Sequence, residues 1–165
     1  MKTLARILFL SLIIINFSCS DDDDDGGPAY EFTNQNLQGQ INGKSWSFVE
    51  GVAEVSPFDD TKLSIELGAE ELESPCDLFA LSGLRVFFSI PHEVALTELN
   101  FSLEEGGQTV TLFDPDGTLN IIATEGAVEI LTITDTEVTG RIDAREGGGG
   151  EDGVNGNFSV TYCSE

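Results

Sequence analysis

Few side chains in this sequence have the types and spacing that catalysis requires. His92 is the only histidine in the chain, and it lies in the stretch SIPHEV at the end of a predicted strand. A hydrolase triad needs a serine and a carboxylate beside such a histidine, and the sequence contains no G-x-S-x-G nucleophile elbow. The sequence therefore favours a protein that is not an enzyme and that needs no cofactor, with an exported hydrolase as the less favoured alternative.

The strongest candidate for binding an ion is the turn FDPDG at residues 113–117. Asp114 and Asp116 are two positions apart and are followed by a glycine, which is similar to half of a calcium-binding loop. The rest of such a loop is missing, and Asp-Pro-Asp-Gly is also a favourable turn sequence. We therefore consider two interpretations, a calcium site at Asp114 and Asp116 or an ordinary turn.

Aromatic residues suggest a second kind of site, a surface that stacks against sugars. Trp46 is the only tryptophan, and Phe48 shares its strand face. Phe87 lies on the opposite face of its strand from the more apolar set that includes Phe88. We take Trp46 and Phe87 as candidate ligand-binding residues, with the alternative that Trp46 and Phe48 point inward as a core pair.

Two of the three cysteines form a natural pair. Cys19 is set apart near the N-terminus, which leaves Cys76 and Cys163. An even number of cysteines in an exported chain predicts a disulfide. The alternative is two separate thiols, of which one is reactive, but neither cysteine has a basic neighbour in sequence that would activate it.

Residues 1–18 have the features of a secretory signal peptide. Lys2 and Arg6 precede an apolar stretch at residues 7–17, which is shorter than the roughly 20 residues that span a bilayer. Ser18 then places a small side chain before Cys19. The arrangement resembles the lipobox of bacterial lipoproteins, with Asn16 where a leucine is usual, and this resemblance implies that Cys19 is acylated. An ordinary signal peptide is the alternative.

An acidic run follows the cysteine. Ser20 and the five aspartates at 21–25 resemble the acidic export tract of Bacteroidota lipoproteins, which implies an outer-membrane protein that faces the cell exterior. The alternative is a solvated spacer. Adjacent carboxylates repel one another, so we expect residues 19–36 to form a flexible tether between the lipid anchor and the domain.

The charge of the chain limits its partners. Without residues 1–18 the chain keeps five of its seven basic residues and all 30 acidic residues, which gives a formal net charge of −25. Nucleic acids require a basic face, and anionic lipids repel such a domain. Attachment to the membrane must then be covalent. The acidity itself fits attraction of cations or adaptation to a salty habitat.

The rest of the chain, residues 37–165, has the pattern of a β protein. Asn42-Gly43 predicts a tight hairpin turn, the glycine-rich residues 147–153 predict a hairpin loop, and Asn155-Gly156 predicts a further turn. Alternating apolar and polar residues predict strands at 37–41, 44–48, 61–67, 84–90, 108–112, 118–123, 137–144 and 157–162. We therefore expect a single all-β domain, an antiparallel sandwich or barrel-like sheet of about nine short strands.

The segments INGKSWSF, VTGRIDA and VNGNFSVTYC are similar to small uncharacterised lipoproteins of Bacteroidota. That resemblance implies a β-rich surface domain of unknown role and carries over no catalytic residues. The sequence as a whole predicts a lipid-anchored surface protein whose domain binds a ligand or partner, such as a glycan or another envelope protein. The alternative is a structural or assembly component of an envelope complex.

Overall fold

The computed structural model describes residues 29–76, 82–102 and 107–163. The predicted signal peptide, Cys19 with its predicted acylation and the acidic run lie outside the described residues. Within the described ranges, no helix is long and apolar enough to cross a membrane.

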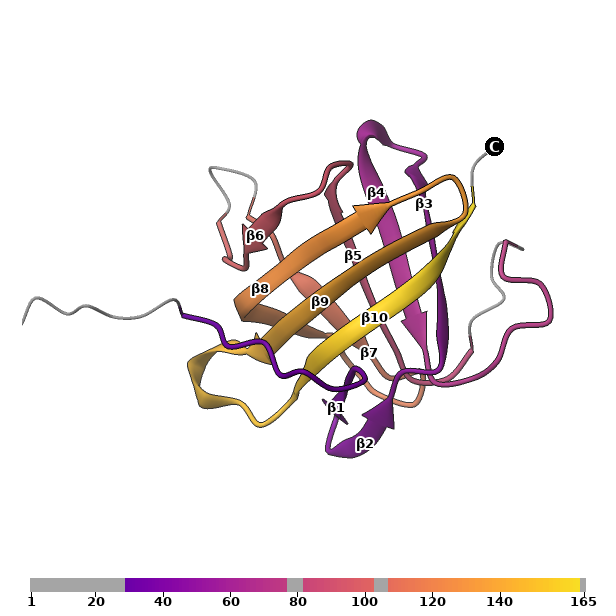
Figure 1. The fold of residues 1–165 in the computed structure, drawn as a ribbon. Helices are drawn as coiled ribbons and strands as arrows, with labels where there is room; N and C mark the ends of the chain where they lie inside the picture. Colours follow the sequence, from indigo (N-terminus) through magenta and orange to yellow (C-terminus); the bar gives the residue numbers. More distant parts are fainter. Residues whose placement is uncertain (1–28, 77–81, 103–106, 164–165) are drawn as a thin grey trace, which may run out of the picture.

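The domain is all-β, as the sequence predicts, and its only helical element in the described part is one short 3-10 turn (Figure 1). The turn covers Gly147–Gly149. The ten strands are β1 Gln38–Ile41, β2 Lys44–Ser47, β3 Glu50–Ser56, β4 Asp59–Gly68, β5 Arg85–Pro91, β6 Leu96–Glu98, β7 Val110–Phe113, β8 Ile121–Ile133, β9 Glu137–Glu146 and β10 Gly153–Cys163.

Seven of these strands form a closed barrel. The hydrogen-bonded ring runs β10-β3-β4-β5-β7-β8-β9 and returns to β10. All neighbours in the ring are antiparallel except β10 and β3, which pair in parallel over Thr161–Cys163 and Val52–Glu54. The hairpin β1–β2 adds to the first half of β10, and β6 adds to β8. The sheet is thus barrel-like and not wholly antiparallel.

Alternate residues of the ring strands point inward and form one apolar core. On β5, Val86, Phe88 and Ile90 are buried, while the residues between them are partly exposed. The rings of Phe88 and Phe158 meet edge to face across the interior, with centroids 6.3 Å apart. A closed sheet with alternating side chains buries one face of every strand in this way.

Two of the three predicted turns form as expected. The β1–β2 hairpin turns at Asn42 and Gly43, which both have positive φ (51° and 71°), as a tight hairpin turn requires. The glycine-rich segment 147–153 joins β9 to β10. The turn predicted at Asn155-Gly156 is wrong, because both residues lie inside β10. Gly156 has φ 141°, and a side chain there would meet the Leu37 backbone at 2.7 Å.

The folded part of the chain begins earlier than the sequence predicts. We expected residues 19–36 to be a flexible tether, but residues 29–36 lie along the outer face of β9 and β10 (Figure 1). We call this segment the strap. The Asn155 side chain binds the strap through two hydrogen bonds. Its Nδ2 donates to the Glu31 carbonyl (2.7 Å), and its Oδ1 accepts from the Thr33 amide (2.8 Å). Residues 29–36, the last eight positions of the tether predicted at 19–36, therefore belong to the folded domain.

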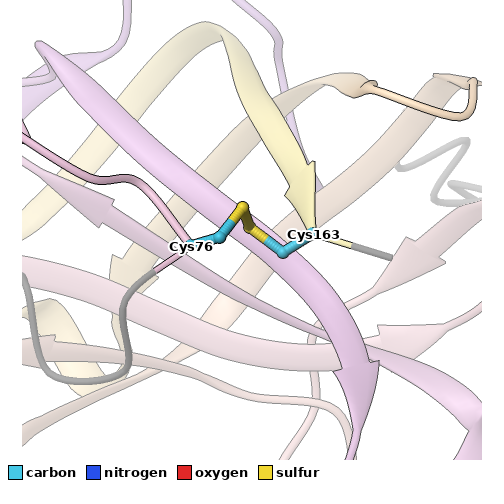
Figure 2. The surroundings of a disulfide bond; sticks show 2 residues. All are labelled: Cys76 and Cys163. Atoms are coloured by element: carbon cyan, nitrogen blue, oxygen red, sulfur yellow. A yellow bond between two sulfur atoms is a disulfide. The ribbon is translucent and has the colours of Figure 1, made fainter. Parts of the chain in front are cut away.

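The predicted disulfide is present. Cys76, in the long connection between β4 and β5, is bonded to Cys163 at the end of β10, with a Cα–Cα distance of 5.5 Å (Figure 2). The bond lies directly beside the parallel pairing of β10 with β3, where Cys163 is opposite Glu54. It therefore secures the strand end that closes the barrel.

Removal of this disulfide should lower the stability of the domain without changing its fold. In the chain-entropy model, a loop closed over 87 residues contributes about 4–5 kcal/mol. For a domain of this size, the double variant C76S/C163S should melt roughly 10–20 °C lower than the oxidised protein. Thermal unfolding followed by circular dichroism measures the change. A reductant should lower the melting temperature of the wild type to that of the variant, and an unchanged melting temperature in both would contradict the assignment.

Candidate functional site

The outer face of β4, β5 and β7 carries a groove of about 390 Å³. Phe87 lies in it, half-buried and pointing away from the barrel interior. The groove is lined by Lys62, Ser64, Ile65, Glu66, Phe87, Phe88, Ser89, Gly107, Gln108, Thr109 and Thr111. This combination of an aromatic ring with several small polar side chains makes the groove the main candidate for a binding site.

Strand register places the lining residues in ordered rows. On the β4–β5 pair, Ser64 is opposite Ser89 and Glu66 is opposite Phe87. On the β5–β7 pair, Phe87 is opposite Thr111. Side chains directly opposite on neighbouring strands lie about 5 Å apart. Phe87 therefore stands between a carboxylate and a hydroxyl, with a row of serine hydroxyls next to it.

The groove lies where the pairing of β5 with β7 ends. Their ladder covers Arg85–Phe87 opposite Thr111–Phe113, whereas β5 continues to Pro91. Beyond Phe87, the segment before β7 turns toward Asn100, whose amide donates to the Gln108 carbonyl (2.8 Å). The β5–β7 ladder thus ends at Phe87, and the groove lies over this point, bounded by β4, β5 and residues 107–111.

Neighbouring side chains hold the Phe87 ring in place. Its centroid lies 6.4 Å from that of Phe113, with the planes tilted by 53°. The Arg85 guanidinium in turn lies over the Phe113 ring, 4.5 Å from its centroid. Contacts between aromatic rings and with a cation each stabilise such an arrangement. Phe87 thus packs in a cluster with Phe113 and Arg85, and its ring presents an apolar surface to the groove.

The chemistry of the groove suits a ligand with both apolar and hydroxyl surfaces. The ring of Phe87 offers an apolar face, and each hydroxyl of Ser64, Ser89 and Thr111 can donate one hydrogen bond and accept two. Lys62 and Glu66 add one charge of each sign. A sugar has apolar C–H faces and hydroxyl edges, which match these two kinds of surface.

The sequence predicts Phe87 as a candidate binding residue, and the structure places it in the groove, but the sequence analysis did not single out the hydroxyl residues around it. The sequence feature that could have indicated these residues is the alternation of polar and apolar positions. Thr109 and Thr111 occupy every second position of QTVTL, and Ser64 and Ser89 lie on the polar faces of their strands. Which strands are neighbours, and hence that these positions share one face, follows only from the topology.

Trp46, the other aromatic candidate, is not part of a binding surface. Its side chain is 2% exposed, and its indole Nε1 donates a hydrogen bond to the Leu84 carbonyl at 3.0 Å. Phe48 is buried as well. The alternative interpretation, in which Trp46 and Phe48 are an inward pair, is the correct one.

The buried Asp114 carboxylate forms an ion pair with the half-exposed Lys44 instead of a cation site. Its carboxylate accepts hydrogen bonds from the Asn42 side chain (2.8 Å) and the Asp116 amide (3.0 Å), and the Lys44 ammonium lies 2.8 Å away. These contacts connect the β1–β2 hairpin to the turn after β7. The pKa of Asp114 is lowered to about 2. The hydrogen bond from Lys44 has the largest effect, and the hydrogen bond from Asn42 has the second largest. The hydrogen bond between Lys44 and Asp114 also raises the pKa of Lys44.

This geometry gives the aspartates a structural role and does not support calcium. Lys44 already supplies the positive charge at Asp114, and Asp116 also lies 3.5 Å from the same ammonium. In the part of the chain that the structure describes, no group of three or more His, Cys, Asp or Glu side chains could hold a metal ion.

His92 has an aromatic neighbour. The Tyr162 hydroxyl lies 3.5 Å from Nε2 of His92, and the two rings meet edge to face with centroids 5.9 Å apart. The His92 amide donates to the Thr61 carbonyl at 2.8 Å. These contacts join the start of the β5–β6 connection to β4 and to the end of β10, and they give the imidazole a packing role.

Two further hollows, of about 430 and 560 Å³, flank the strap. Both are lined by Asp143, Arg145 and Asn155, whose polar atoms bind the strap or one another. Asp143 accepts from the Glu31 amide (3.0 Å) and from Nε of Arg145 (3.2 Å), and Arg145 also donates to the Ala29 carbonyl. These groups are occupied by the chain itself, so the groove at Phe87 is the better candidate.

Comparison with protein-family models, with curated proteins and with solved structures finds no match to this chain.

The buried Asp114 predicts a pH dependence of stability. Because its pKa in the fold is about 2, below the ordinary value of 3.8, the carboxylate stabilises the fold above about pH 4 and loses this effect as the pH falls toward 2. Asp114→Asn should therefore be less stable than wild type at neutral pH, and the difference should narrow between pH 4 and 2. Urea unfolding at several pH values measures this.

Asp116→Asn is the matched control, because its side chain is 86% exposed in the same turn. It should change the free energy of unfolding little at any pH. An Asp114→Asn variant as stable as wild type at neutral pH would show that the ion pair does not support the fold.

Proposed function

We propose that this protein is a lipid-anchored outer-membrane protein of the cell surface whose β-barrel domain binds a glycan and has no enzymatic activity. The groove at Phe87 is its binding site. The observation that carries the proposal is the position of the braced Phe87 ring, in a groove whose other walls present serine and threonine hydroxyls.

The proposed location is supported by the N-terminal sequence. An apolar segment, Ser18-Cys19 and the aspartates at 21–25 follow one another in the order that resembles surface lipoproteins. The disulfide between Cys76 and Cys163 fits a chain that folds in an oxidising compartment. The partners in this proposal are the membrane, through the lipid on Cys19, and a glycan in the groove.

A structural or assembly role is the second candidate, and one surface favours it. Val94, Leu96 and Leu131 are 62%, 39% and 43% exposed. Leu96 is opposite Glu129 on the β6–β8 pair, and Ala95 accepts from the Ile130 amide, so the three apolar side chains lie close together. Strand β6 also ends the strand order of the sheet. An apolar patch beside an edge strand is a typical contact for a protein partner.

Thermal unfolding of the oxidised domain in a panel of soluble polysaccharides tests the glycan proposal. The protein should start at Gly27, so that the strap is retained. A ligand at 100 times its dissociation constant adds about 2.7 kcal/mol, which raises the melting temperature of a domain this size by several degrees.

Phe87→Ala should abolish the shift produced by the active polysaccharide, because the variant removes the apolar surface of the groove. Phe58→Ala is the matched control. Phe58 is 96% exposed at the β3–β4 turn and lies outside the groove, so this variant should respond as wild type. A flat panel would refute the glycan proposal. Cross-linking on intact cells, compared between wild type and Leu131→Ser, would then test the apolar patch.

A further inference from the structure

We propose that the groove at Phe87 selects glycans that carry free amino groups, and that the protonated nitrogen of the sugar binds between the Glu66 carboxylate and the Phe87 ring. The inference rests on the proposed glycan function and adds the charge of the ligand. Neutral glycans then bind the groove less tightly, and acidic glycans are rejected.

Glu66 lies between two apolar side chains on the outer face of the sheet. It is opposite Phe87 on β5 and opposite Val52 on β3. Side chains that are directly opposite on neighbouring strands lie about 5 Å apart. Glu66 and Phe87 are both half-buried, and both line the groove. An ammonium group that enters the groove here pairs with the carboxylate and lies close enough to the ring for a cation–π contact.

The Glu66 carboxylate has no cationic partner among the described residues. The ion pairs between described residues use Lys44, Arg141 and Arg145. Lys62 lies on the same face of β4 as Glu66 but four positions away, which is about 13 Å along the strand. That separation exceeds the Debye length of about 8 Å at physiological ionic strength, so salt screens the charge of Lys62 at this point. The carboxylate can therefore pair with a ligand.

The guanidinium of Arg85 lies on the other side of Phe87 from Glu66. Arg85 is opposite Phe113 on β7, and its guanidinium lies over the Phe113 ring, 4.5 Å from the centroid. Glu66 is on β4, across β5 from that pair. The cation of Arg85 thus belongs to the β7 side of the groove, and the β4 side carries the carboxylate.

Further carboxylates surround Glu66. Glu50 is opposite Gly68 and Glu54 is opposite Ser64, so both glutamates lie on β3 diagonally across from Glu66. Diagonal neighbours on paired strands are about 7–8 Å apart. The whole chain also has a formal net charge of −23. This potential attracts a cationic ligand to the groove and repels a ligand that carries carboxylates of its own.

The hydroxyl groups of the groove distinguish an amino sugar from other amines. Ser64 is opposite Ser89, and this pair lies two positions from the Glu66–Phe87 pair, or about 7 Å along the strands. An amino sugar carries its ammonium group and several hydroxyl groups on one ring, so it can reach both pairs. A lysine side chain reaches the carboxylate and the ring but offers the serines no hydrogen-bonding partner.

Calorimetric titration with two matched oligosaccharides tests the charge of the ligand. The oxidised domain from Gly27 would be titrated with a chitosan oligomer and with the fully N-acetylated chitin oligomer of the same length. At mildly acidic pH the sugar amines are protonated, while a glutamate remains ionised. The chitosan oligomer should bind about tenfold more tightly, as an ion pair and a cation–π contact together predict. An oligomer of galacturonic acid should not bind.

The outcomes separate this inference from the glycan function. If the chitin oligomer or any neutral polysaccharide binds at least as tightly as the chitosan oligomer, selection for amines is refuted and the glycan function stands. If no sugar binds, both are refuted.

Glu66→Gln locates the effect in the groove. The variant should bind the chitosan oligomer only as tightly as wild type binds the chitin oligomer, and its affinity for the chitin oligomer should not change. Glu98→Gln is the matched control, because it removes the same charge from an exposed position on β6 outside the groove. This variant should bind both oligomers as wild type does. An equal loss in both variants would show that the overall charge attracts the oligomer, which overturns the inference.

A lysine oligomer with the same number of positive charges separates an amino sugar from a cationic peptide. It should bind more weakly than the chitosan oligomer. The double variant Ser64→Ala with Ser89→Ala should weaken binding of the chitosan oligomer and leave that of the lysine oligomer unchanged. Equally tight binding of the two oligomers to wild type would show that the groove recognises amines in general and would refute its specificity for an amino sugar.

Discussion

The pairing of β10 with three other strands is the constraint on which the rest of the structure depends. β10 pairs with β9 over nine positions, with β1 at its beginning and, in parallel, with β3 at its end. The parallel contact covers only three residue pairs, yet it converts a curved sheet into a closed barrel. Closure removes two open edges. The disulfide at Cys163 acts on this short contact, because it ties the last strand residue to the connection after β4.

β10 also binds the two N-terminal segments of the domain, the strap and strand β1. Its first half carries β1, and the polar side chains of Asn155 and Asn157 on its outer face hold the strap. The β1–β2 hairpin is then fixed to the far side of the sheet by the Asp114–Lys44 pair. Contacts with the chain itself thus occupy the β9–β10 face, whereas the β4–β5–β7 face keeps an open groove. The strap therefore covers one face of the barrel, and the face on the other side remains open to a ligand.

Sequence reasoning found the fold class, the disulfide, the Asn42-Gly43 hairpin and most strands, since these depend on local alternation and turn chemistry. It missed β3, because its inward positions include the small residues Gly51 and Ala53 and give no apolar stripe. It ended β8 too early, because bulges near Ala123 and Ile130 shift the alternation. Phe87 was found as an outward ring. Its hydroxyl neighbours, the partners of Asp114 and the docking of the strap depend on long-range strand order, which one sequence does not encode locally.

The central claim is that the β4–β5–β7 face of the barrel recognises a glycan, and that the β9–β10 face, which the strap covers, does not. Chemical-shift mapping of the uniformly ¹⁵N-labelled domain during titration with polysaccharide tests it most directly. The account predicts that the perturbed amides cluster on β4, β5 and β7 around Ser64, Phe87 and Thr111, with those of the strap unchanged. Perturbations that cluster on the strap and β9–β10, or on the β6 edge, would contradict it.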